Sequence, residues 1–296
     1  MIKDLKKPLT YEEQLEKLKE HKLKIGDEAK ALKILERLNY YKLSGYGLGF
    51  RNEKYSDLYK PGTSFELLYE LFLFDEELRI FLLKFLLKIE IYLRTRIAND
   101  FSLIKCKESP YDQHYDIENY YRKEKFQEVF NSLEKEKDNN SDSLVIKHHD
   151  KKYNGKMPLW VIVELLSFSN LSKYYNSLFE SDKKVIADKL GVAHKVLSNH
   201  MHCLSVLRNK CAHSSRIYNN DFAPPAKLGR EYLKKYNDVF NGSLFAYCRI
   251  IYLRLPEEKD KKDFVKGLKN IISDYEESIN LSDIGFPADW LKVISV

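Results

Sequence analysis

The segment from residue 75 to residue 101 constrains the fold of this chain more than any other. It contains neither glycine nor proline, and its apolar residues are spaced so that nearly every side of a helix would be apolar. Such a helix must lie at the centre of a protein, where other elements cover all of its faces. Charged residues interrupt it from position 79 to position 96, so we expect a buried helix and no membrane-spanning segment.

The rest of the chain also favours helices. Only 11 glycines and 8 prolines occur among the 296 residues, too few for the many turns of a sheet protein. Thr10 with Glu13, and Thr63 with Glu66, have the spacing of a helix capping box. The sequence therefore predicts an all-α protein. Helices are expected within residues 10–38, at 65–74 and 75–101, near 123–137, and at 159–167, 171–179, 185–190, 192–213, 241–255 and 257–279.

The polarity of the chain changes at residue 102. Residues 102–156 are polar, charged and rich in tyrosine, which indicates an insertion with one short helix. We expect an N-terminal helical segment over residues 1–60, a core over 61–225 that includes this insertion, and C-terminal helices over 226–296. These three parts are expected to pack as one compact unit.

Charge and cysteine content say little about the partner but more about the compartment. The net charge of +6 favours polyanions only weakly, and many proteins of this charge bind no nucleic acid. Lysines and an aspartate near the start leave no apolar run for a signal peptide. We therefore expect a cytoplasmic protein whose cysteines are reduced thiols. These cysteines are Cys106, Cys203, Cys211 and Cys248.

Residues 39–51 place three glycines among tyrosines, in the sequence NYYKLSGYGLGFR. No Gly-Lys-Ser/Thr follows, so this is not a phosphate loop. One interpretation is a turn packed against the core by its buried aromatic rings. The other is a surface on which RNA bases stack.

The segment LRNKCAH, residues 207–213, carries the most chemical information. At about 100° per residue, Arg208 falls within an apolar helix face marked by Met201 and Leu204. A buried guanidinium needs a carboxylate, a subunit interface or a bound phosphate. Asn209 and His213 share a face, so the amide is placed to hydrogen-bond the imidazole. Arg208 lies roughly 140° from His213, too far round one straight helix for both to reach a single atom.

These residue types suit the cleavage of RNA without a metal. Histidine titrates near neutral pH and can act as the base that removes the proton of the ribose 2′-hydroxyl. The planar, permanently charged arginine fork matches phosphate oxygens and stabilises the negative charge of the transition state. The alternative is a structural ion pair beside a surface histidine.

Arg208-Asn209-x-x-x-His213 resembles the signature of HEPN-domain ribonucleases. Four further segments, in order along the chain, resemble the AbiD/AbiF-like abortive-infection family of bacteria. They are residues 38–46 (LNYYKLSGY), 89–96 (IEIYLRTR), 157–164 (MPLWVIVE) and 285–290 (GFPADW). The chain departs from the family pattern at Ser169, where glycine is common, and at Gly47, where an aromatic residue is common; both differences are expected to concern packing.

The resemblance implies a HEPN-like helical bundle, and a homodimer in which two Arg/His motifs meet in a composite cleft. It also implies a toxin whose RNA cleavage halts growth in phage-infected cells. Arg208, Asn209 and His213 would be the catalytic residues, and no cofactor would be required. RNA is the expected substrate, and a structured noncoding RNA is a further expected partner.

Secondary candidates surround the motif. Glu90 and Arg94 are four apart and are predicted to form an ion pair; alternatively, arginines of this helix join the phosphate site. The RNA-binding candidates are Arg94, Arg96, Lys210 and Arg216. His200, His202 and Cys203 invite a zinc hypothesis, but His202 points away from the other two and structural zinc prefers tightly paired ligands, so no metal site is expected.

Two other functions compete with the ribonuclease. One is an RNA-binding protein of the same fold that holds a structured RNA without cutting it. The other is an interaction subunit that senses a phage component.

Overall fold

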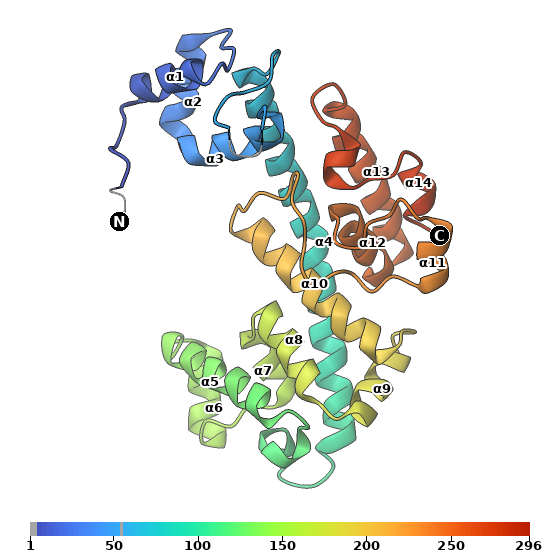
Figure 1. Ribbon diagram of the computed structural model, residues 1–296. Helices are drawn as coiled ribbons and strands as arrows, with labels where there is room; N and C mark the ends of the chain where they lie inside the picture. Colours follow the sequence, from blue (N-terminus) through green and yellow to red (C-terminus); the bar gives the residue numbers. More distant parts are fainter. Residues whose placement is uncertain (1–4, 54–55) are drawn as a thin grey trace, which may run out of the picture.

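The computed structural model describes residues 5–53 and 56–296, and within these residues it is all-α, as predicted (Figure 1). The longest element is α4 (Phe65–Lys105), a continuous helix of 41 residues, about 60 Å long. The sequence predicted two helices here, but no break occurs at residue 75. Leu71, Leu78 and Leu82 of this helix are completely buried, so α4 is the expected central core helix.

The other helices are mostly short. They are α1 (Tyr11–Glu20), α2 (Glu28–Arg37), α3 (Tyr40–Ser44), α5 (Lys123–Asn139), α6 (Leu144–Tyr153), α7 (Leu159–Leu165), α8 (Phe168–Ser177), α9 (Glu180–Asp188), α10 (His194–Ala212), α11 (Arg230–Lys235), α12 (Leu244–Arg254), α13 (Glu258–Asp274) and α14 (Trp290–Val293). Four 3-10 helices, η1 (Gly45–Phe50), η2 (Gln113–Tyr115), η3 (Ile117–Asn119) and η4 (Leu281–Ile284), complete the secondary structure of the described residues. Each of these helices, α4 included, is too short or too polar to cross a bilayer.

The helices are arranged along α4, which runs the length of the molecule (Figure 1). Helix α10 crosses α4 near its middle and packs also on α8, α9 and α12. Helices α1–α3 gather at one end of α4, α5–α9 surround the other end, and α11–α14 cover one side. The C-terminal end of α10 therefore lies between the two ends of the molecule.

One of the two predicted capping boxes is present. Thr10 and Glu13 form the reciprocal pair at the start of α1. The prediction for the start of α4 was wrong, because Ser64 is the N-cap and accepts from the backbone N–H of Leu67. Glu66 instead accepts from the backbone N–H of Gly26 (2.9 Å), and so joins α4 to the turn between α1 and α2.

The polar segment 102–156 is more ordered than predicted. It holds the expected helix α5, but also α6, which sequence patterning missed because few apolar residues repeat along it. Ser143 caps α6, while Ile146 and His149 are the residues it buries. Helix α5 packs on α7 and α8, so this segment is part of the helical body.

Asp75 joins three parts of the fold at one buried carboxylate. It accepts from the hydroxyl of Tyr46 (2.8 Å) and pairs with Arg79 on its own helix (3.0 Å). It also accepts from the backbone N–H groups of Ile217 (3.0 Å) and Tyr218 (2.6 Å). The carboxylate thus fastens η1 and the segment after α10 to the same turn of α4.

The close packing of η1 gives a prediction for Gly47. A Cβ at this position would lie 2.5 Å from Cε1 of Tyr59 and 3.1 Å from Cδ1 of Leu68, both buried residues. Because neither neighbour has free space, Gly47→Ala is expected to lower the free energy of unfolding by about 1 to 3 kcal/mol. Denaturant unfolding measures this. Gly45→Ala is the control, since its Cβ would meet nothing within 4 Å; an equal loss in both variants would contradict the packing argument.

Candidate functional site

Helix α10 carries the Arg-Asn-x-x-x-His motif on its last turn and a half. Its buried face, which includes Leu204, Leu207 and Cys211, packs into the core. Arg208 and Asn209 are half-buried. His213 is the C-cap residue and is exposed, with its backbone N–H donating to the carbonyl of Asn209 (2.9 Å). The helix therefore holds the backbone of the motif but leaves the imidazole free to meet a ligand.

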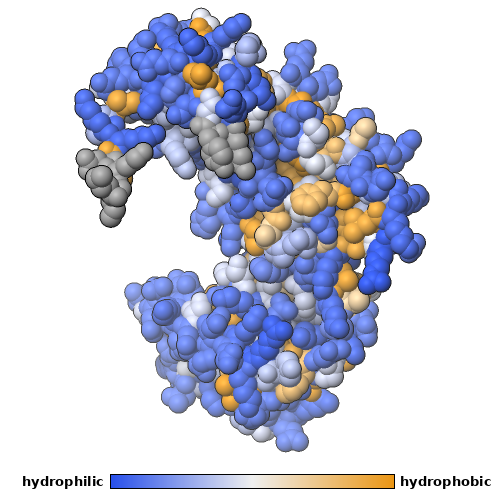
Figure 2. Space-filling view, viewed as in Figure 1, coloured by the Kyte–Doolittle hydropathy of each residue, from blue (hydrophilic) through white to orange (hydrophobic). Residues whose placement is uncertain are grey.

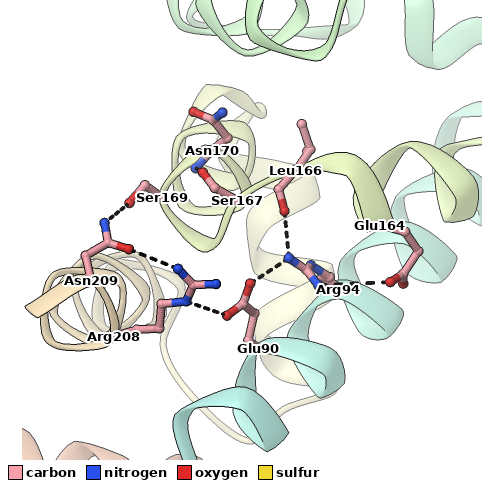
Figure 3. Close-up of polar contacts among 9 residues, drawn as sticks. All are labelled: Glu90, Arg94, Glu164, Leu166, Ser167, Ser169, Asn170, Arg208 and Asn209. Atoms are coloured by element: carbon pink, nitrogen blue, oxygen red, sulfur yellow. Dashed lines mark hydrogen bonds and ion pairs between the residues drawn. The ribbon is translucent and has the colours of Figure 1, made fainter. Parts of the chain in front are cut away.

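Arg208 is held by a buried carboxylate. Its Nε lies 3.3 Å from Oε2 of Glu90 on α4, a residue only 1% exposed. The other carboxylate oxygen of Glu90 pairs with Nη2 of Arg94 at 2.6 Å (Figure 3). The predicted Glu90–Arg94 pair is thus present, and the same carboxylate satisfies the arginine that the sequence placed on an apolar face.

Two guanidinium groups share this one buried carboxylate. Arg94 also donates to the carbonyl of Leu166 (2.6 Å), and its next carboxylate, that of the exposed Glu164, is 4.0 Å away. The side chain of Arg208 is 27% exposed. Arg208 therefore combines a fixed position with an accessible edge, as a ligand for an anion requires.

Asn209 is engaged differently from the prediction. Its Oδ1 accepts from Nη1 of Arg208 (3.4 Å), and its Nδ2 donates to the hydroxyl of Ser169 on α8 (3.1 Å). Within residues 5–53 and 56–296, no hydrogen bond joins its amide to the imidazole of His213. Ser169 was expected to matter only for packing, yet it contacts the motif directly (Figure 3).

His213 faces a cavity of about 1130 Å³, here called the α3 cavity. The cavity lies between residues 39–48 and residues 213–216, and is completed by Lys6, Lys17, His21, Arg51 and Asp57. Figure 2 shows that the molecule is hollowed between the part that holds α1–α3 and the part that holds α5–α8, and that the surface around this hollow is largely hydrophilic. Among the residues that the structure describes, five lysines and arginines and one carboxylate line the cavity, so these residues give it an excess of positive charge.

A single chain separates the two halves of the motif. His213 lines the α3 cavity, whereas Arg208 and Asn209 are absent from its described walls and lie beside α4 and α8. This agrees with their separation of roughly 140° around α10.

The family model described as Abi-like protein matches residues 33–219. This match covers more than half of the chain and includes α3, α4, the polar segment and the whole motif. The chain belongs to the Abi-like protein family. No curated protein and no solved structure matches it. The segment 285–290, which also carried the resemblance, lies outside the matched residues.

The four secondary candidates of this Abi-like chain lie in different surroundings. Arg94 belongs to the Glu90 cluster, and Arg96 pairs with Asp100 at 3.2 Å. The ammonium of Lys210 lies over a phenylalanine ring. Arg216 lines the α3 cavity and donates to the carbonyl of Gly45 (2.6 Å). Of these four, only Arg216 shares the cavity with His213.

Sequence reasoning missed the N-terminal contribution to the α3 cavity. Lys17, Lys42 and Arg51 come from segments more than 150 residues before His213, and the chain folds back to bring them together. A signal was present in the NYYKLSGYGLGFR segment, where the interpretation as a turn packed by buried aromatic rings is confirmed for Tyr46 and the interpretation as an RNA-stacking surface stays a prediction. Tyr46 is buried as a packing residue, while Tyr41 is 85% exposed beside the cavity.

No metal site forms at the residues considered for zinc. In the described part of the chain, no group of three or more possible ligands surrounds a common point. His200 donates from Nε2 to the carbonyl of Lys227 (2.9 Å), and Cys203 contacts the carbonyl of Pro224. His202 is exposed on the other side of α10.

The burial of His200 predicts a pH dependence of stability in this Abi-like protein. Burial lowers the pKa of His200 to about 4 from its ordinary 6.5. Below pH 6.5, His200 binds a proton in the unfolded chain but stays neutral in the folded chain. The free energy of unfolding therefore falls by at most about 3 kcal/mol as the pH drops from about 6.5 to about 4. Chemical unfolding of wild type and His200→Gln at pH 7 and pH 5 measures it. The variant should lose less stability on acidification than wild type, with His202→Gln as the exposed control; equal pH dependence in wild type and His200→Gln would contradict the assignment.

Proposed function

We propose that this chain is a metal-independent endoribonuclease of abortive-infection defence, in which His213 is the acid–base residue and Arg208 binds the scissile phosphate. The observation that carries the proposal is the exposed imidazole of His213 at the wall of an electropositive cavity. A polyanion with an internal nucleophile fits this pairing. RNA has both, because each phosphate neighbours a ribose 2′-hydroxyl.

In the proposed reaction, His213 removes the proton of the 2′-hydroxyl, which then attacks the adjacent phosphorus. The 5′-oxygen of the next nucleotide leaves and takes back the proton that His213 removed, and the products are a 2′,3′-cyclic phosphate and a 5′-hydroxyl. Arg208 stabilises the charge on the phosphate oxygens. Glu90 is its positioning residue, since this buried carboxylate fixes the guanidinium.

The proposed active unit is a homodimer. In one chain, His213 lines the α3 cavity, whereas Arg208 is bound to Glu90 and does not line it. A second copy that brings its own motif against the first would complete the site. Membership of the Abi-like family supports the role in phage defence and, with it, a toxic activity in the bacterial cytoplasm.

A second candidate function is RNA binding without cleavage. The α3 cavity favours it, because the cationic and aromatic side chains that line it outnumber its two histidines, His21 and His213. A third candidate, a subunit that senses a phage component, would make no use of this cavity.

Induced expression in bacterial cells tests the three candidates. Wild type is expected to arrest growth and to fragment cellular RNA, while His213→Ala does neither but still copurifies with RNA. Arrest by both proteins, with intact RNA, would favour binding alone. Absence of both arrest and copurified RNA from wild type would favour the sensing subunit. His202→Ala, an exposed histidine of the same helix, is the matched control and should behave as wild type.

A further inference from the structure

The cations of the α3 cavity are unevenly neutralised. Arg51 pairs with Asp57 at 2.9 Å. Lys17, Lys42 and Arg216, by contrast, have no carboxylate within 4 Å among the residues that the structure describes. Three positive charges therefore line the same cavity without a counter-charge from the described chain, so each can neutralise a phosphate.

Tyr41 adds a feature that packing does not explain. Its side chain is 85% exposed, although it follows the half-buried Tyr40 and precedes the buried Leu43. The carboxamide of Asn39 accepts from the backbone N–H of Tyr41 (2.8 Å), which caps α3 and fixes this residue at the cavity wall. An exposed aromatic ring beside cations that lack a carboxylate is the arrangement that stacks nucleic acid bases.

We propose that the α3 cavity binds a single-stranded segment of RNA, with a base stacked on Tyr41 and phosphates on Lys17, Lys42 and Arg216. A duplex hides its base faces, so only an unpaired base can reach the Tyr41 ring. The cavity of about 1130 Å³ is larger than most small ligands need, which favours a polymer. The choice of RNA rests on the proposed function, because His213 shares this cavity.

The placement of these residues gives the cavity a task in the reaction. Lys42 and Tyr41 come from α3, and Arg216 lies three residues after His213. A strand held by all of them passes His213, so the cavity would select unpaired RNA and present its backbone to the imidazole. Cleavage should then fall between unpaired nucleotides.

Binding of an uncleavable strand tests this inference separately from catalysis. A fluorescent single-stranded oligonucleotide with 2′-O-methyl groups is titrated at several salt concentrations into wild type, Tyr41→Ala, Lys42→Ala and Tyr121→Ala. Tyr41→Ala is expected to weaken binding roughly tenfold or more. Lys42→Ala should lower the slope of log K against log salt by about 0.7. Tyr121, which is 67% exposed but lies outside the cavity, is the matched control and should leave binding unchanged.

Each other outcome overturns one of the two proposals. The inference would be overturned if Tyr41→Ala and Lys42→Ala bound as well as wild type, or if Tyr121→Ala lost as much affinity as they do. It would also be overturned if a matching duplex bound more tightly than the single strand, or if the strand did not bind at all. Binding that depends on Tyr41, by a protein that cuts no RNA, would overturn the proposed ribonuclease and support the cavity. Because Tyr41 is almost fully exposed, its replacement leaves the fold intact.

Discussion

Replacing His213 by alanine is expected to lower the rate of RNA cleavage by about 10²- to 10⁴-fold, the usual contribution of a general acid–base residue. The imidazole is exposed and caps α10 only through its backbone, so the substitution removes the proton acceptor without removing core contacts. Single-turnover cleavage of a short RNA measures the rate. Binding of the uncleavable strand should change little.

Two further histidines test whether the loss of cleavage is specific to His213. His202 is exposed on the same helix but outside the α3 cavity, so His202→Ala should cleave at the wild-type rate. His21 lines the cavity opposite the motif. If His21→Ala loses cleavage while His213→Ala retains it, the acid–base role belongs to His21 and the assignment of His213 is wrong.

Glu90→Gln is expected to lower the free energy of unfolding by about 3 to 5 kcal/mol, the cost of breaking a buried ion pair. The substitution keeps the shape of the side chain but leaves Arg94 and Arg208 without their shared counter-charge. Glu90 is 1% exposed, so water does not replace it. Denaturant unfolding measures the loss, and the remaining folded protein should also cleave more slowly because Arg208 is no longer fixed.

Glu164→Gln is the matched control for this prediction. Its carboxylate is 64% exposed and lies 4.0 Å from the same Arg94, so its removal should cost less than about 1 kcal/mol. Similar losses in the two variants, or a negligible loss in Glu90→Gln, would show that the cluster is held by packing rather than by charge.

The buried helix from residue 75 to residue 101 and the Glu90–Arg94 pair could be predicted from the sequence because their determinants are local, although the continuation of this helix back to Phe65 was missed. An apolar segment without glycine or proline specifies a buried helix, and residues four apart on it, such as Glu90 and Arg94, specify a pair. The requirement for a carboxylate near Arg208 was also predictable from the cost of burying a guanidinium. That this carboxylate is Glu90 was not, because the contact joins residues 118 positions apart.

The α3 cavity was beyond the reach of sequence patterning. Its walls come from α1, α3 and the end of α10, and only tertiary packing brings them together. Asp75 shows the physical reason, since one buried carboxylate ties Tyr46 of η1 to the backbone after His213. Helix α6 was missed for a different reason: its residues are mostly polar, and packing rather than periodicity places it.

Analysis of the product ends formed without metal tests the ribonuclease proposal most directly. Purified protein, freed of copurified RNA, is incubated with a single-stranded RNA in excess chelator, and the products are identified by mass. Attack by the 2′-hydroxyl predicts a 2′,3′-cyclic phosphate and a 5′-hydroxyl from wild type, and no product from His213→Ala. Intact RNA in chelator, or cleavage that leaves 3′-hydroxyl ends and requires added metal, would contradict a reaction centred on His213 and Arg208.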